Sequence, residues 1–122
     1  MHKTKPEWQA GKINGLGGKV EEGEEASTCI QRELKEESGL IIEATAWTHV
    51  ASLQGPLWVV DVFGATYLGD STDAKSQEEE KIEWFAVNNL PDNVIDNLRW
   101  LIPMTIDKLR HGAFRQGVVE YL

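Results

Sequence analysis

Apolar residues recur along this chain at two different spacings, and each spacing predicts a different kind of element. From about Glu24 to Ser38 the apolar positions repeat every four residues, as on the buried face of a helix. These positions are Ala26, Ile30 and Leu34. Residues 41–53 alternate loosely and are rich in β-branched side chains, and residues 57–68 form a more apolar run. Both stretches predict strands, and the turn residues 54–56 between them predict a β-hairpin.

The second half of the chain predicts one more helix and two more strands. The expected elements are, in order, a polar loop at 69–77, a strand at 81–87 (KIEWFAV), a turn at 89–92, a helix from about Ile95 to Arg110 and a short strand at 118–122. Pro103 falls inside this helix and predicts a kink or a restart, whereas Gly112 is placed to end it. We expect Trp100 to be buried on the same helix.

Composition fits one compact domain and narrows the range of partners. The chain has 122 residues, of which 41% are hydrophobic, and this length gives room for a single core. Its formal net charge of −8 argues against a polymeric nucleic-acid partner, which would require clustered Lys and Arg. The single cysteine, Cys29, excludes an intrachain disulfide and is expected in the core. The N-terminal residues form no apolar stretch, so we expect no signal peptide, no membrane span and a cytoplasmic location.

Residues 18–40 read GKVEEGEEASTCIQRELKEESGL and fill every fixed position of G-x5-E-x7-R-E-U-x-E-E-x-G-U, where U is aliphatic. The matching residues are Gly18, Glu24, Arg32, Glu33, Leu34, Glu36, Glu37, Gly39 and Leu40. At ordinary residue frequencies a random window matches about once in 10⁹. This pattern is the signature of the Nudix hydrolases, and the chain resembles that superfamily. The resemblance implies an α/β fold, an α/β/α sandwich around a mixed β-sheet, as a single domain over residues 1–122.

The helix within the motif brings carboxylates together on one edge. Glu33, Glu36 and Glu37 are three or four residues apart or adjacent, so all three fall on the same side of the helix. Like charges this close repel each other, and Mg²⁺ or Mn²⁺ bound to carboxylate oxygens would offset the repulsion. A solvated acidic helix face is the alternative meaning of such a run. By resemblance, Arg32 orients the glutamates and Glu24 is its partner.

The glycine-rich segment before the helix is the second part of the candidate site. Gly15, Gly17 and Gly18 let the backbone turn sharply and approach a charged ligand, although the same glycines also suit an ordinary tight turn. The resemblance implies that the carbonyl of Gly17 completes a metal shell and that Lys19 faces the phosphates. Gly18 and Gly39 are expected to be structural, with Gly39 ending the helix in a left-handed conformation.

Three further positions bear on the substrate. Asn14 precedes the glycine loop, where MutT-like relatives use an asparagine amide to recognise a purine edge; a turn-forming role is the alternative. Asp96 and Asn97 occupy the positions of two acidic base-contacting residues in the human-type oxidised-purine hydrolases, and Val94 replaces their stacking tryptophan.

The loop residues Glu78, Glu79 and Glu80 precede the predicted 81–87 strand, and Glu79 aligns best with a further metal-linked carboxylate. A solvated charge cluster is the alternative there.

These features predict Mg²⁺-dependent hydrolysis of a nucleoside diphosphate linked to another group. Water would attack a phosphorus in line, and one of the motif carboxylates or Glu79 would accept its proton. A modified purine nucleoside triphosphate, cleaved to a monophosphate and pyrophosphate, is the first hypothesis. Hydrolysis of another nucleoside diphosphate derivative, such as a dinucleotide or ADP-ribose, is the second, and an inactive nucleotide-binding module is the third.

The start of the chain leads to an expectation about assembly. Nudix chains carry core strands before the segment that matches HKTKPEWQAGKING, whereas here that segment follows Met1 directly. Either the start was assigned too late or the fold lacks that element, and a fold truncated in this way would leave the apolar 57–68 strand with an unpaired edge or an uncovered face. Because exposed edges and apolar patches recruit partners, we expect a homodimer.

Overall fold

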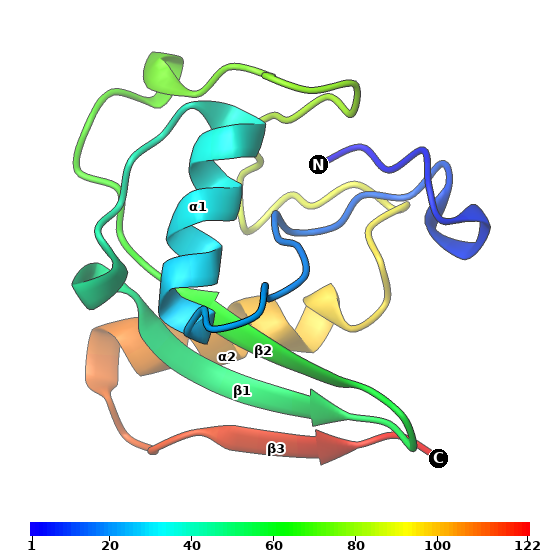
Figure 1. Ribbon diagram of the computed structural model, residues 1–122, viewed down its shortest axis with the longest axis vertical. Helices are drawn as coiled ribbons and strands as arrows, with labels where there is room; N and C mark the ends of the chain where they lie inside the picture. Colours follow the sequence, from blue (N-terminus) through cyan, green and yellow to red (C-terminus); the bar gives the residue numbers. More distant parts are fainter.

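The computed structural model describes all 122 residues as a three-stranded mixed sheet with two α-helices. Helix α1 (Ala26–Ser38) stands at the end of the sheet where β1 begins and β2 ends, and helix α2 (Leu98–His111) lies behind the strands (Figure 1). This arrangement confirms the predicted α/β fold around a mixed sheet. Neither helix is long and apolar enough to span a membrane.

The central strand of the sheet is β1 (Thr48–Gln54). It pairs antiparallel with β2 (Val59–Gly64), which confirms the predicted hairpin, and parallel with β3 (Gly117–Glu120). The small core lies on this strand and contains Val50, Ala51, Leu53 and Leu101. The first strand is shorter than predicted, because residues 41–47 leave the sheet and include a 3₁₀ turn at Ala44–Ala46. Strand β2 lies at one edge, and Val59 and Val60 are exposed on it.

Both helices end at the glycines that the sequence indicated. Gly39 follows α1 with φ +76°, and its N–H donates to the carbonyl of Lys35. Gly112 follows α2 with φ +60° and donates to Lys108 in the same way. This left-handed conformation satisfies carbonyls at a helix end and favours glycine. Each helix begins two or three residues later than predicted, and α2 continues through Pro103.

Two expectations about the second half of the chain were wrong. Trp100 is 38% exposed, because α2 packs on the sheet through Leu98, Leu101 and Met104, and position 100 is turned away from that stripe. Residues 81–87 form no strand. Trp84 in this segment instead donates from its indole nitrogen to the carbonyl of Ser71 at 2.8 Å and stacks with Tyr67. An extended pattern needs a neighbour with free backbone groups to become a strand.

The N-terminal residues are held by isolated backbone pairings instead of a full strand. Ile13 bridges His2 on one side and Val94 on the other. The N–H of Ile13 donates to Asn93 at 3.0 Å, and the N–H of Ile95 donates back to Ile13 at 2.9 Å. These contacts bring the residues before the glycine loop next to the residues before α2.

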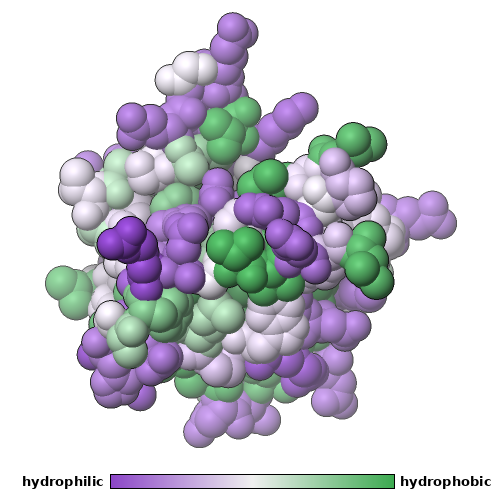
Figure 2. Space-filling view, turned by 90° about the horizontal axis from the view of Figure 1, so that it is seen from below, coloured by the Kyte–Doolittle hydropathy of each residue, from purple (hydrophilic) through white to green (hydrophobic).

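Apolar side chains line a cavity beside α1 and are also exposed on the outer surface. A cavity of about 430 Å³ lies against the inner side of α1, and 18 of its 22 lining residues are hydrophobic. On the face seen from below in Figure 1, apolar side chains lie between hydrophilic ones (Figure 2). The exposed large hydrophobic residues near the hairpin tip and the chain end include Leu57, Trp58, Val59, Val60, Val118, Tyr121 and Leu122. The prediction of an exposed edge on the 57–68 segment agrees with this structure.

Candidate active site

The glycine loop packs directly against the acidic edge of α1. The N–H of Gly17 donates to Oε1 of Glu37 at 3.0 Å. A Cβ on Gly18 would lie 2.1 Å from Oε1 of Glu33, so a side chain at this position would require the Glu33 carboxylate to move. Two of the three motif carboxylates are therefore in close contact with the backbone that precedes the helix.

Arg32 joins the remaining acidic residues into one network. Its guanidinium binds Glu24 through two hydrogen bonds, from Nε at 2.8 Å and from Nη2 at 3.0 Å. Nη1 donates to Glu33 at 2.9 Å and to Glu36 at 3.2 Å, and Nη2 also donates to the carbonyl of Lys19 at 3.2 Å. Hydrogen bonding to Arg32 lowers the pKa of Glu24 to about 2, and the same pairing raises the pKa of Arg32. Arg32 thus links the glycine loop to the carboxylates of α1.

Glu37 differs from its neighbours because it is buried and forms no ion pair. It is 5% exposed, and no ion pair in the structure includes it. Burial raises the pKa of Glu37 to about 7, with a further contribution from the charge of Glu33, although the hydrogen bond from Gly17 acts in the opposite direction. A buried carboxylate of this kind is stabilised by a nearby cation.

The three carboxylates do not converge on one point in this arrangement. Glu33 and Glu36 turn toward Arg32, whereas Glu37 turns toward Gly17. No three acidic, histidine or cysteine side chains lie close enough together to hold a metal ion jointly. The donor chemistry does fit a hard divalent cation, because carboxylate oxygens are its preferred ligands and Glu37 forms no ion pair that would compete for it. Joint coordination would require Glu33 or Glu36 to turn away from Arg32.

A second loop approaches the same end of α1 and contains a residue that the sequence analysis undervalued. The three consecutive glutamates lie in this loop, and Glu78 and the predicted Glu79 are exposed. Glu80 is 8% exposed and accepts hydrogen bonds from Lys3 Nζ at 2.9 Å and from the N–H of Thr4. Burial disfavours the charge of Glu80, but these bonds outweigh it and lower its pKa to about 2. Nothing in a run of identical residues distinguishes the buried member from the exposed ones.

The residues predicted to recognise the base, Asn14, Asp96 and Asn97, have separate contacts in the structure. Asn14 accepts from the N–H of Gly15 at 2.8 Å and donates to Gln9 at 3.2 Å, so its amide is engaged locally, as a turn-former would be. Asp96 is exposed and follows the Ile13-bridged segment. Asn97 instead donates to the hydroxyl of Tyr121 at 3.4 Å. Lys19 is exposed, and only its carbonyl is held, by Arg32.

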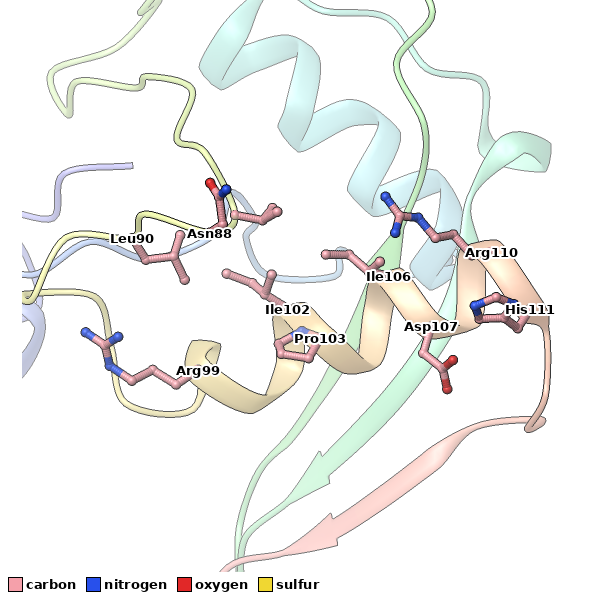
Figure 3. A pocket seen from close by; sticks show the side chains of 10 residues that line it. Asn88, Leu90, Arg99, Ile102, Pro103, Ile106, Asp107, Arg110 and His111 are labelled. Atoms are coloured by element: carbon pink, nitrogen blue, oxygen red, sulfur yellow. The ribbon is translucent and has the colours of Figure 1, made fainter.

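Two hollows lie near these residues, and only one adjoins the motif. The apolar cavity of about 430 Å³ is lined by Asn14, Gly15 and Leu16 together with Leu34 and Ser38 of α1. A second hollow of about 410 Å³ lies between α2 and residues 87–90, where Leu90 lies opposite Ile102 (Figure 3). No residue of α1 lines this second hollow, so it is separate from the carboxylate edge.

Comparison with known proteins agrees with the geometry. The sequence profile of the NUDIX domain matches residues 2–105. The chain belongs to the Nudix family. This Nudix chain is 28% identical over 118 residues to the NAD-capped RNA hydrolase NudC of Vibrio atlanticus, covering 95% of the chain and 44% of that protein. It is also 34% identical over 116 residues to the oxidized purine nucleoside triphosphate hydrolase of Mus musculus, covering 87% of the chain and 70% of that protein.

A further relative carries the same description. The oxidized purine nucleoside triphosphate hydrolase of Danio rerio is 31% identical over 123 residues, covering 92% of the chain and 77% of that protein. The Nudix chain spans less than half the length of the NudC proteins it matches. The family and the hydrolase descriptions of these relatives agree with the sequence-based expectation of a Nudix pyrophosphohydrolase.

Proposed function

We propose that this Nudix chain hydrolyses a purine nucleoside triphosphate, in a modified form such as an oxidised purine, to a nucleoside monophosphate and pyrophosphate. The observation that supports this most strongly is the glycine loop held against Glu33 and Glu37 of the complete motif. The relatives described as oxidized purine nucleoside triphosphate hydrolases support the substrate class, because the chain covers 70% and 77% of their lengths.

The proposed cofactor is Mg²⁺, with Mn²⁺ as a substitute. Glu33, Glu36 and Glu37 would hold it, together with the carbonyl of Gly17 and with Glu79 from the loop. When bound, the cation supplies neutralisation of the charge that develops on the phosphates. Carboxylate oxygens and a backbone carbonyl are suitable ligands for it.

Besides holding the cation, the residues of the site would position the carboxylates, accept a proton and contact the phosphates. Arg32, fixed by Glu24, holds Glu33 and Glu36 at the edge of α1 until a cation competes for them. One of the motif carboxylates or Glu79 accepts the proton of the attacking water. Lys19 follows the glycine loop and is free in solvent to contact phosphate oxygens.

Recognition of the base is assigned to the cavity beside the glycine loop. A volume of about 430 Å³ falls in the size range of small-ligand sites, and its apolar lining suits a planar ring. Asn14 lines this cavity, and Asp96 follows the neighbouring segment, so both are proposed to meet the polar edge of the purine, with Asn97 beside them. Asn14 would have to release Gln9 to do so.

A second candidate function comes from the NudC relatives. Their description as NAD-capped RNA hydrolases favours a substrate in which the diphosphate joins two nucleosides, such as a dinucleotide. An inactive nucleotide-binding module is the third candidate, and the complete set of motif glutamates argues against it.

A nucleotide panel would separate these functions. Purine and pyrimidine triphosphates, their oxidised forms, ADP-ribose and dinucleotides would be incubated with Mg²⁺, and the products would be separated by anion-exchange chromatography. We expect pyrophosphate release from purine triphosphates to exceed that from pyrimidine triphosphates by about 10-fold, for a contact of about 1–3 kcal/mol. Faster cleavage of dinucleotides would favour the second function, and no cleavage of any compound would favour the third.

A further inference from the structure

The loop that contains the three consecutive glutamates is attached to α1 by its backbone. The N–H of Lys75 donates to the carbonyl of Ser38 at 2.9 Å, and the N–H of Gln77 donates to the carbonyl of Glu37 at 3.2 Å. Ser38 and Glu37 form the last turn of the helix, where carbonyls lack partners within the helix. The loop therefore satisfies the end of α1 and passes next to its carboxylate edge.

The other end of this loop is held by the first residues of the chain. Glu80 accepts from Lys3 Nζ at 2.9 Å, from Thr4 Oγ1 at 3.2 Å and from the N–H groups of Thr4 and Lys5. The N–H of His2 donates to the carbonyl of Lys81 at 2.7 Å. Because its charge is satisfied by four donors, Glu80 can remain buried there.

Glu78 and Glu79 lie between these two attachments. Both are exposed and take part in none of the ion pairs of the structure. The charge of Glu78 reaches Glu37, where it adds to the raised pKa of that group. The position of these two carboxylates relative to α1 is thus set by the backbone bonds on one side and by Glu80 on the other.

We propose that Glu80 is a positioning residue. Through its bonds to Lys3 and Thr4, it holds Glu78 and Glu79 over the carboxylate edge of α1. This position increases the affinity of that edge for a divalent cation. This inference rests on the proposed function, because it takes the edge to be the cation site. It assigns to Glu80 a role different from that of Glu79, since Glu80 contacts neither the cation nor the substrate. Residues that orient metal ligands in this way typically contribute 10-fold to 100-fold in affinity or activity.

The experiment measures Mn²⁺ binding by electron paramagnetic resonance, which detects free Mn²⁺ and needs no turnover. Glu80→Ala is expected to raise the Kd for Mn²⁺ by about 10-fold. Lys3→Met should raise it in the same direction, and the double variant should show less than the sum of the two effects, because the residues act as a pair. Glu7→Ala is the matched control, because Glu7 is an exposed glutamate of the same N-terminal segment with no ion pair, and its Kd should equal that of the wild type.

These measurements distinguish a loss of positioning by Glu80 from a loss of the fold and from the absence of a cation site. Circular dichroism of each variant reports whether it is folded, and the Kd applies to the folded protein only. Should Glu80→Ala fail to fold, Glu80→Gln keeps an acceptor for Thr4 while losing the charge that pairs with Lys3, and a several-fold rise in its Kd is then expected. A folded variant at position 80 with the wild-type Kd would overturn the positioning role alone. A wild-type chain that binds no Mn²⁺ would overturn both this role and the proposed function.

Discussion

At the scale of single residues, two positions of the motif are defined by their immediate surroundings. Gly18 is one, because the carboxylate of Glu33 occupies the space that a side chain would need. Glu37 is another, because it is a buried acid with no ion-pair partner. The identities of both residues were evident from the motif. Their contacts were not, because the sequence does not report that Glu37 contacts the loop, that Glu36 contacts Arg32 and that Glu33 contacts both.

Replacement of Gly18 by alanine should impair hydrolysis with little loss of stability. The added methyl group displaces the carboxylate of Glu33 from the loop, and misplacement of a metal ligand typically costs about 10-fold to 100-fold in activity. Steady-state kinetics with saturating Mg²⁺ would measure kcat. Circular dichroism of the variant would show that it is folded. A kcat equal to that of the wild type would contradict this account of Gly18.

Replacement of Glu37 by glutamine should abolish hydrolysis and leave the fold intact. The amide is similar in size but carries no charge, so the site loses a cation ligand while the burial of a carboxylate is relieved. We expect the free energy of unfolding to stay the same or to rise by a few tenths of a kcal/mol. Urea denaturation and product release would be measured on the same sample, with Glu22→Gln as an exposed control. Turnover near that of the wild type would rule out the assigned role.

At the scale of elements, the sequence predicted correctly those elements that depend on residues close together in the chain. The helix of the motif and its end at Gly39 were predictable, because apolar spacing and a left-handed glycine are local properties. The hairpin was predictable for the same reason. The expected strand at 81–87 did not form, because pairing requires a partner distant in sequence, and the nearby N-terminal residues offer Lys81 a single backbone bond from His2. Glu80 was named with Glu78 and Glu79 but not singled out from them, since its partner Lys3 is 77 residues away in sequence.

The two helix ends provide a comparison that separates backbone strain from side-chain contact. Gly39→Ala and Gly112→Ala both force a residue with a Cβ into the left-handed region, at a cost of about 1 kcal/mol each. A Cβ at position 39 also lies 3.3 Å from the Gln77 side chain, whereas nothing lies within 4 Å at position 112. We therefore expect the larger loss of unfolding free energy for Gly39→Ala, measured by urea denaturation. The reverse order would show that Gln77 moves aside without cost.

At the scale of the whole molecule, the sheet is small for the amount of apolar surface around it. Three strands and two helices leave a large apolar cavity and an edge strand with exposed valines. An unpaired strand edge favours association with another chain. We propose on this basis that the chain forms a homodimer through β2.

Light scattering after size exclusion would test this assembly. The wild type should elute as a dimer at micromolar concentration, and Val60→Lys should shift it to a monomer, because a lysine on an edge strand opposes pairing. Leu68→Lys is the control, since Leu68 is exposed but lies outside the strand. A monomeric wild type, or a dimer that persists in Val60→Lys, would contradict dimerisation through this edge.

The parallel pairing of β1 with β3 has a consequence for the order in which the molecule can assemble. The sheet is complete only when residues 48–54 pair with residues 117–120, which form the last strand of the structure. During synthesis, a nascent chain still lacking that strand can form the hairpin and α1 but cannot close the sheet. Contacts between such distant segments slow folding. We therefore expect the hairpin and α1 to form before the sheet closes, and the apolar side of β1 to be available to chaperones until β3 pairs with it.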